Sequence, residues 1–137
     1  MQSNGKTEGK IQTINEKINL NLLETKKLLD KILEWLSEAK SENLVSLYIA
    51  DKSSIADYMI IASGRSDRHV GAIAEQLQKK LKEAGCQGVR VEGLEVCDWV
   101  LIDSGNIIVH IFRPQVREFY NLEKMWSLDR PTLESTN

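Results

Sequence analysis

Two stretches of the chain repeat their apolar residues at the helical period. The apolar positions of the first are Leu29, Ile32, Leu33 and Leu36. Those of the second are Val70, Ile73, Ala74, Leu77, Leu81 and Ala84. Such spacing places each set on one side of an amphipathic helix. The polar cluster 41–43 ends the first helix, whereas Ser66 or Asp67 can cap the start of the second and Gly85 supplies its left-handed stop.

The residues before the first helix carry a weaker form of the same period. Its apolar positions are Ile11, Ile14 and Ile18. Thr13 with Glu16 can form a capping box there. The first ten residues are polar and aperiodic, which predicts a frayed tail. We interpret residues 1–20 as an N-terminal extension that is partly helical, and whether residues 11–20 join the following helix stays open at this point.

Short apolar runs of strand type fill the middle of the chain. The expected strands are 44–49, 58–62, 89–92, 99–103 and 106–112. The run Tyr58–Ala62 is apolar throughout, which suits a central strand buried on both faces. Pro114 suits the first position of a terminal helix, whose apolar side is Val116, Phe119 and Tyr120, continued by Leu122, Met125 and Trp126. The pattern predicts a single α/β domain over 21–127, with a mixed sheet of about five strands flanked by helices and a tail over 128–137.

The last two strands form a predicted hairpin around Ser104-Gly105. A two-residue loop there sets Asp103 opposite Asn106, Leu101 opposite Ile108 and Trp99 opposite His110. One face of the hairpin is then wholly apolar: Val100, Ile102, Ile107, Val109 and Ile111. The other face mixes aromatic, aliphatic and polar groups: Trp99, Leu101, Asp103, Asn106, Ile108, His110 and Phe112. That mixture is typical of a recognition surface, for a partner or for a second copy of the chain, although a terminal helix covering an ordinary core would also explain it.

Charge narrows the choice of partner. The chain has 137 residues and a formal net charge of −2, which argues against a protein that binds nucleic acid by neutralising phosphates. Between Val89 and Phe112 the single cation Arg90 faces four carboxylates, from Glu92, Glu95, Asp98 and Asp103. This part of the protein should therefore prefer a basic partner.

Residues that carry chemistry are few. The two cysteines and two histidines show no spacing typical of a metal site or a nucleophilic triad, so we expect no enzyme activity, no metal and no cofactor. The loop Gly64–Asp67 joins a strand to a helix and can hold a phosphate, or it can be only a turn with an N-cap. The alternative function is a diverged nucleotidyltransferase that uses this loop. No apolar run reaches the 18 residues of a membrane span and no secretory signal opens the chain, so we expect a cytoplasmic protein without membrane contact.

Several motifs occur in an order that resembles the ribosomal silencing factor (Iojap) family. The first group is Asp57–Gly64, Ser66, Arg68–Val70 and Ile73-Ala74. The second is Val91–Gly93, Asp98–Val100, Asp103–Asn106, Val109–Phe112 and Arg117–Trp126. The resemblance extends over about Leu22–Ser127, and the last run is its most specific part.

The resemblance implies a protein that is not an enzyme. Members of that family bind the large ribosomal subunit through large-subunit ribosomal protein fourteen, block joining of the small subunit and repress translation, and organellar relatives are linked to large-subunit assembly. It also implies a core similar to nucleotidyltransferases without their catalytic carboxylates, and little direct contact with nucleic acid. The family's aromatic interface positions fall on Trp99 and Tyr120 here. Strand alternation adds Leu101, Ile108 and His110 as expected partner-binding residues.

Overall fold

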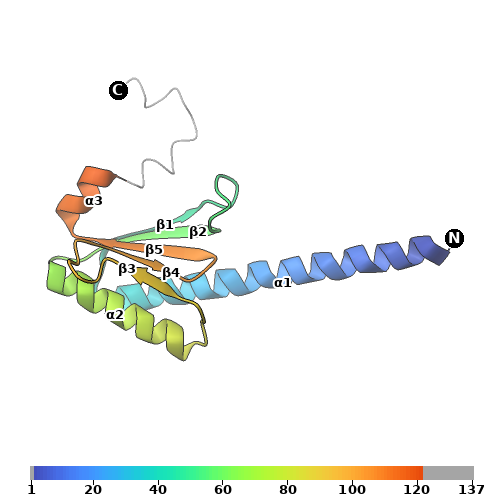
Figure 1. The fold of residues 1–137 in the computed structure, drawn as a ribbon, viewed down its shortest axis with the longest axis horizontal. Coiled ribbons are helices and arrows are strands. Elements are labelled where there is room, and N and C mark those ends of the chain that lie inside the picture. Colours follow the sequence, from blue (N-terminus) through green and yellow to red (C-terminus); the bar gives the residue numbers. More distant parts are fainter. Residues whose placement is uncertain (1, 122–137) are drawn as a thin grey trace, which may run out of the picture.

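The computed structural model describes residues 2–121, except the side chains of residues 2–8, 11, 18–20 and 120. The elements follow in the order α1 (Gln2–Glu38), β1 (Glu42–Tyr48), β2 (Tyr58–Ser63), α2 (Asp67–Glu83), β3 (Arg90–Glu92), β4 (Trp99–Asp103), β5 (Ile107–Phe112) and α3 (Pro114–Tyr120). Figure 1 shows α1 and α2 against one face of the sheet and α3 on the other. Within the described part, the predicted α/β fold with helices flanking one sheet is confirmed.

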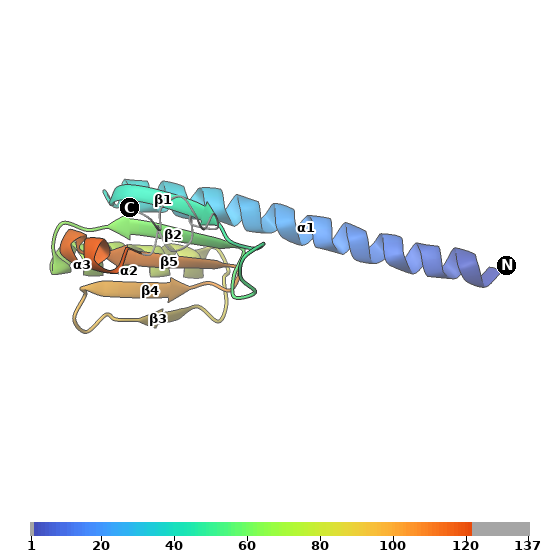
Figure 2. The ribbon, with the colours of Figure 1, turned by 90° about the horizontal axis from the view of Figure 1, so that it is seen from above.

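The sheet has five strands in the order β1-β2-β5-β4-β3 (Figure 2). The central pair β2 and β5 is parallel, whereas each of the other neighbouring pairs is antiparallel. Every residue of β5, and all of β2 except the half-buried Tyr58, is buried, as the unbroken apolar run of β2 predicted. The mixed five-stranded sheet is therefore confirmed as well.

The main core lies between the sheet and the two long helices. The apolar hairpin face, Val100, Ile102, Ile107, Val109 and Ile111, is fully buried there. Against it pack Leu29, Ile32 and Leu36 of α1 together with Val70, Ile73, Ala74, Leu77 and Leu81 of α2. These residues are most of the helical stripes that the sequence predicted. Of the other two predicted positions, Leu33 is partly buried beside this core, whereas Ala84 is exposed at the end of α2.

Helix α1 is longer than the sequence pattern indicates. It runs unbroken from Gln2 to Glu38, so residues 11–20 join the packed helix, and the expectation of a frayed tail over the first ten residues is wrong for residues 2–10. The buried turns near its end nucleate the helix, and each further residue then adds a hydrogen bond at little cost. Figure 2 shows its N-terminal half extending beyond the sheet, where the described side chains from Gly9 to Glu24 are exposed.

The hairpin register differs from the predicted one by two residues. Asp103 pairs with Ile108, Leu101 with His110, and Trp99 with Phe112. The two-residue loop is Gly105-Asn106, because the backbone N–H of Ser104 donates to the carbonyl of Ile107 at 3.0 Å. Gly105 has φ +101°, and a turn of this kind takes glycine at its first loop position rather than its second. A shift of two residues preserves the faces, so the predicted sorting of side chains stands although the predicted pairs are wrong.

The helix boundaries follow local signals. The hydroxyl of Ser66 accepts from the backbone N–H of His69 and caps α2, Gly85 follows that helix with φ +88°, and Pro114 opens α3. The expected continuation through Leu122, Met125 and Trp126 lies outside the described residues. Within the described part, no helix combines the length and apolarity that crossing a membrane requires.

Candidate functional site

A second, smaller apolar cluster occupies the opposite face of the sheet. Its buried members are Ile49, Ala56, Met59, Ile61, Ile108 and Phe112. Trp99, Leu101, Leu47 and Val116 lie partly buried at its margin. The loop between β1 and β2 supplies two of the buried residues, and α3 supplies Val116. This face is therefore covered in its middle, while its margin on β4 stays accessible.

Trp99 is held at that margin by two buried aromatic neighbours. Its indole Nε1–H donates to Nδ1 of His110 at 2.9 Å, and its ring centroid lies 4.9 Å from that of Phe112. The rings of His110 and Phe112 stack at 5.9 Å with an angle of 11°. Alternation brings the three together, because Trp99 and Phe112 are a cross-strand pair and His110 lies diagonally across from Trp99. The partly exposed indole is thus oriented by contacts within the protein itself.

The protonation state of His110 follows from its surroundings. The side chain is 6% exposed, and burial lowers its pKa to about 4. The imidazole is therefore neutral near pH 7. Because Nδ1 accepts from Trp99, the ring proton resides on Nε2. The observed orientation of the Trp99 indole therefore requires a neutral His110.

The predicted partner-binding residues divide into two groups. Trp99 and Leu101 are partly exposed, whereas Ile108 at 8% and His110 at 6% are buried beneath them. The four lie together on one face of the β4–β5 hairpin. Tyr120 is the last residue of α3, and its side chain lies outside the described ones. Phe119, assigned by the sequence to the apolar side of α3, is instead 80% exposed next to Tyr120.

The acidic character of this region is partly neutralised. Arg90 Nη2 lies 2.8 Å from Asp103 Oδ2, and Arg113 Nε lies 2.8 Å from Asp98 Oδ1. Burial acts to raise the pKa of the Asp103 carboxyl, but hydrogen bonds from Arg90 and from the Gly105 backbone outweigh it, and the pKa falls below its usual value. Arg113 lies one residue beyond the acidic segment Val89–Phe112 and still neutralises Asp98 within it. The negative charge exposed to a partner is smaller than the sequence count suggests.

Several backbone amides around the loop Gly64–Asp67 have partners within the protein. The N–H of Gly64 donates to the carbonyl of Phe112, and that of Arg65 donates to His69 Nδ1 at 2.9 Å. The N–H of His69 also donates to Ser66 Oγ, so these three amides already have partners within the protein. Nε2 of His69 lies 3.2 Å from the carbonyl of Ala39, which links the end of α1 to the start of α2. In the described part, no three His, Cys, Asp or Glu side chains gather in a way that suits a metal ion.

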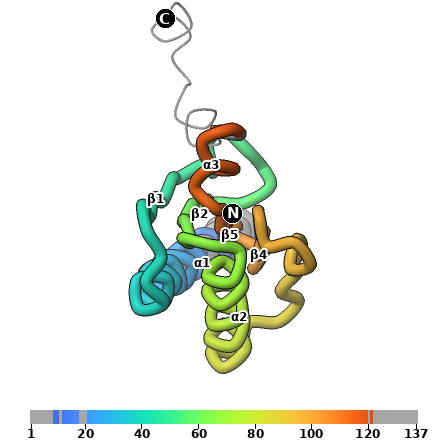
Figure 3. The backbone as a smooth tube through the Cα atoms, turned by 90° about the vertical axis from the view of Figure 1, so that its left-hand side faces the viewer, coloured from blue at the N-terminus to red at the C-terminus, as the bar shows by residue number. Residues whose placement is uncertain are grey.

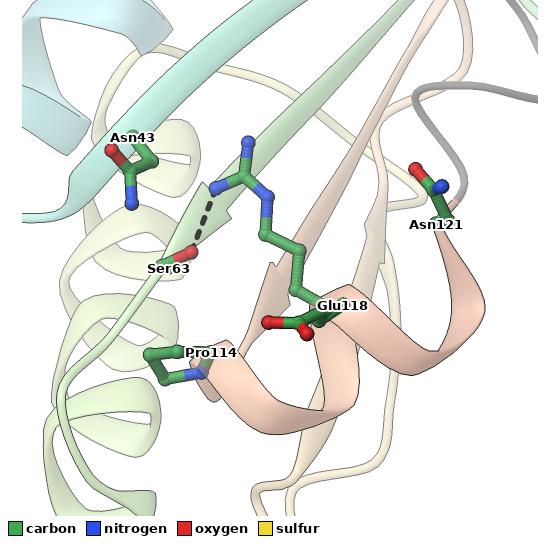
Figure 4. Close-up of a pocket in the computed structure, with 6 residues that line it drawn as sticks. Asn43, Ser63, Pro114, Glu118 and Asn121 are labelled. Atoms are coloured by element: carbon green, nitrogen blue, oxygen red, sulfur yellow. Dashed lines mark hydrogen bonds between the residues drawn. The ribbon is translucent and has the colours of Figure 1, made fainter.

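A polar cavity that the sequence did not indicate lies at the end of β2. It measures about 300 Å³ and is lined by Asn43, Ser63, Pro114, Arg117, Glu118 and Asn121 (Figure 4). Arg117 Nη1 donates to the buried Ser63 Oγ at 2.7 Å and so ties α3 to β2. The lining comes from three parts of the chain far apart in sequence, which is why no local motif identified it.

Comparison with known proteins matches the chain to one family. The family described as "Ribosomal silencing factor during starvation" matches residues 22–137. The chain belongs to the ribosomal silencing factor family. The ribosomal silencing factor of Zymomonas mobilis is 46% identical over 112 residues, which cover 79% of this chain and 84% of that protein. The resemblance inferred from the motifs is therefore confirmed.

Relatives extend from bacterial structures to an organellar protein. A crystal structure of a Chromobacterium violaceum protein superposes with a TM-score of 0.73 at 36% identity and covers 80% of this chain and 91% of that one. The mouse protein named "Mitochondrial assembly of ribosomal large subunit protein 1" is 31% identical over 103 residues, covering 73% of this chain and 45% of that protein. The names of the Zymomonas and mouse relatives concern ribosomes and their regulation or assembly, and neither name indicates catalysis. The similarity to a nucleotidyltransferase core stays a prediction.

Proposed function

We propose that this silencing factor binds the large ribosomal subunit through the margin of β4 and the end of α3, and prevents the small subunit from joining. The observation that carries the proposal is the partly exposed Trp99 indole, which His110 and Phe112 hold at the edge of an apolar cluster. A large aromatic side chain that is already ordered loses little entropy on binding, which is typical of an interface hot spot. The protein then represses translation by occupying the joining face.

The five predicted residues have different roles in this proposal. Trp99, Leu101 and Tyr120 contact the partner. His110 and Ile108 lie beneath them, so His110 orients the indole and Ile108 supports it by packing. The partner we propose is large-subunit ribosomal protein fourteen, which the family resemblance implies, with little contact to RNA. The proposal includes no metal or cofactor, and it assigns the protein to the cytoplasm, in keeping with its bacterial relatives.

Electrostatics adds specificity rather than most of the affinity. Glu92 and Glu95 are exposed near Trp99, whereas Asp98 and Asp103 are paired with arginines. Two exposed carboxylates favour a basic ribosomal protein mainly by speeding association, and this effect weakens with salt. Affinity should depend on the aromatic contacts and should survive at moderate ionic strength.

Sedimentation with isolated large subunits tests the proposal. The wild-type protein should pellet with large subunits and reduce the fraction of joined ribosomes when small subunits are added. Trp99→Ala should weaken binding by about 30-fold, as the loss of about 2 kcal/mol at a hot spot requires. Tyr48→Ala is a matched control, because Tyr48 is an exposed aromatic side chain, at 53%, on β1 at the other edge of the sheet. Equal binding by folded Trp99→Ala and wild type would refute the assigned surface.

A second candidate function, assembly of the large subunit, is favoured by the name of the mouse relative. The same surface would then hold an assembling subunit rather than a mature one. Depletion of the protein distinguishes the two. Accumulation of large-subunit precursors in growing cells supports assembly, whereas excess joined ribosomes only under starvation supports silencing. A homodimer that buries Trp99 is a further alternative, and light scattering of wild type and Trp99→Ala tests it.

A further inference from the structure

The polar cavity lies where open α/β sheets bind ligands. Strands β2 and β5 are parallel neighbours, and their carboxyl ends are Ser63 and Phe112. From β2 the chain continues into α2 on one face of the sheet, and from β5 it continues into α3 on the opposite face (Figures 1 and 3). When the segments that follow two neighbouring parallel strands run to opposite faces of the sheet, a crevice forms beyond the carboxyl ends of those strands. The cavity of about 300 Å³ is that crevice, since Ser63 and Pro114 line it.

The backbone around the cavity takes uncommon conformations that direct amide side chains to it. Asn43 has φ +51° and lies in the irregularity of the β1–β2 pairing between Glu42 and Val45. Asn121 has φ +52° at the end of α3. Bulges are over-represented next to binding sites, where they re-aim a side chain. Both asparagines line the cavity, and Figure 4 shows Asn43 on the same side as Ser63.

The residues that line the cavity supply several hydrogen-bond donors and one carboxylate. Arg117 offers a planar guanidinium, and Asn43 and Asn121 offer amide N–H groups. Arg117 Nη1 already reaches Ser63 Oγ at 2.7 Å, which fixes the guanidinium at the floor of the cavity. Glu118 is the carboxylate of the set. Arginine with amide donors is the arrangement that recognises carboxylate and phosphate oxygens.

We propose that this cavity binds the oxyanion group, carboxylate or phosphate, of a small molecule, with Arg117 and Asn43 as its principal donors. The site does not include Trp99, although Asn121 in its lining follows Tyr120 at the end of α3. The inference does not depend on the ribosomal function. Glu118 lowers the affinity for a bare anion and so favours ligands of low net charge. The volume accommodates a molecule of metabolite size, at the lower end of small-molecule pockets.

Titration of ¹⁵N-labelled full-length protein with inorganic phosphate and, separately, with acetate tests the site by NMR. We expect saturable shifts confined to residues 43, 63 and 117–118 with at least one probe, and the tighter probe identifies the class of anion. Asn43→Asp should weaken that binding by about tenfold or more, because a carboxylate replaces a donor. It keeps the side-chain shape, and aspartate tolerates the left-handed backbone. Glu118→Gln should strengthen the binding a few-fold.

Arg65→Gln is the control for general charge, because Arg65 is an exposed cation of the neighbouring loop and does not line the cavity. It should leave the affinity unchanged. Absence of localised, saturable shifts with both probes at tens of millimolar would overturn the proposal. So would shifts that Arg65→Gln reduces as much as Asn43→Asp does, since that result indicates diffuse attraction of anions.

Discussion

Protonation of His110 should destabilise the protein at mildly acidic pH. An imidazolium has no lone pair at Nδ1 for the Trp99 indole, and a side chain only 6% exposed cannot hydrate the charge. The unfolded chain binds this proton near the usual pKa of 6.5, whereas burial lowers the pKa in the folded state to about 4. Between those values the unfolded state holds more protons, so stability falls as the pH falls. At 1.36 kcal/mol per unit, the full loss is on the order of 3 kcal/mol.

Urea unfolding of wild type and His110→Asn between pH 7.5 and 4 measures this contribution. Asparagine places Oδ1 near the position of Nδ1 and can accept from Trp99, but it does not titrate in this range. The variant loses ring volume and should be less stable at pH 7.5, yet its stability should change less than that of wild type as the pH falls from 6.5 to 4. Titration of Asp103 in the Asp103–Arg90 pair does not contribute to the stability change between pH 6.5 and 4. The pKa of Asp103 is lowered, so its contribution is lost only as the pH falls below its usual 3.8.

Parallel loss of stability by wild type and His110→Asn over this pH range would refute the reasoning. It would mean that His110 is either charged or hydrated in the folded protein. The indole Nε1–H resonance of Trp99 gives a second readout. In wild type it should shift as the pH approaches 4, and in His110→Asn it should not.

Three further predictions concern stability and are all measured by urea unfolding. Gly93→Ala should cost about 1–3 kcal/mol, because φ is +94° and a Cβ would collide with the carbonyl oxygen of Trp99; unchanged stability would show that the turn moves freely. Gly64→Ala should cost a similar amount, since its Cβ would lie 2.8 Å from Val70 Cγ2 and 2.9 Å from Val70 N. Deleting residues 2–20 should change the unfolding free energy by less than about 0.5 kcal/mol, because the described side chains there are exposed; a larger loss would reveal packing by this part of α1.

The fold was predictable because its signals are local. The helical stripe of α2, its cap at Ser66 and its stop at Gly85 are all found within 20 residues of sequence, and the structure uses each of them. The faces of the β4–β5 hairpin were also predictable, since side chains alternate along a strand whatever the register. An error of two residues in pairing therefore left the apolar face correctly buried against the helices.

The long-range features could not be predicted in the same way. Whether a residue on the second sheet face is exposed depends on what packs over it, here Ile49 and Ala56 from the β1–β2 loop and Val116 from α3. No pattern within β5 reveals that cover, so Ile108 and His110 were expected at the surface with Trp99. The polar cavity is even less predictable from local sequence, because Asn43, Ser63 and Arg117 meet only after the sheet and α3 have formed.

The burial of His110 changes how the surface around Trp99 works. A histidine in contact with a partner would make binding depend on its own charge and hydrogen bonds. A buried histidine instead acts through the indole, since the Trp99 Nε1–H donates to its Nδ1 at 2.9 Å and the Phe112 ring stacks on the imidazole. Its effect on binding and its effect on stability then have one cause, protonation of the buried ring, which burial disfavours and which removes the Nδ1 acceptor. Conditions that protonate His110 should therefore free the indole first and weaken the proposed ribosomal contact. Most of the main core should still be intact at that pH, because its buried members include no titratable side chain.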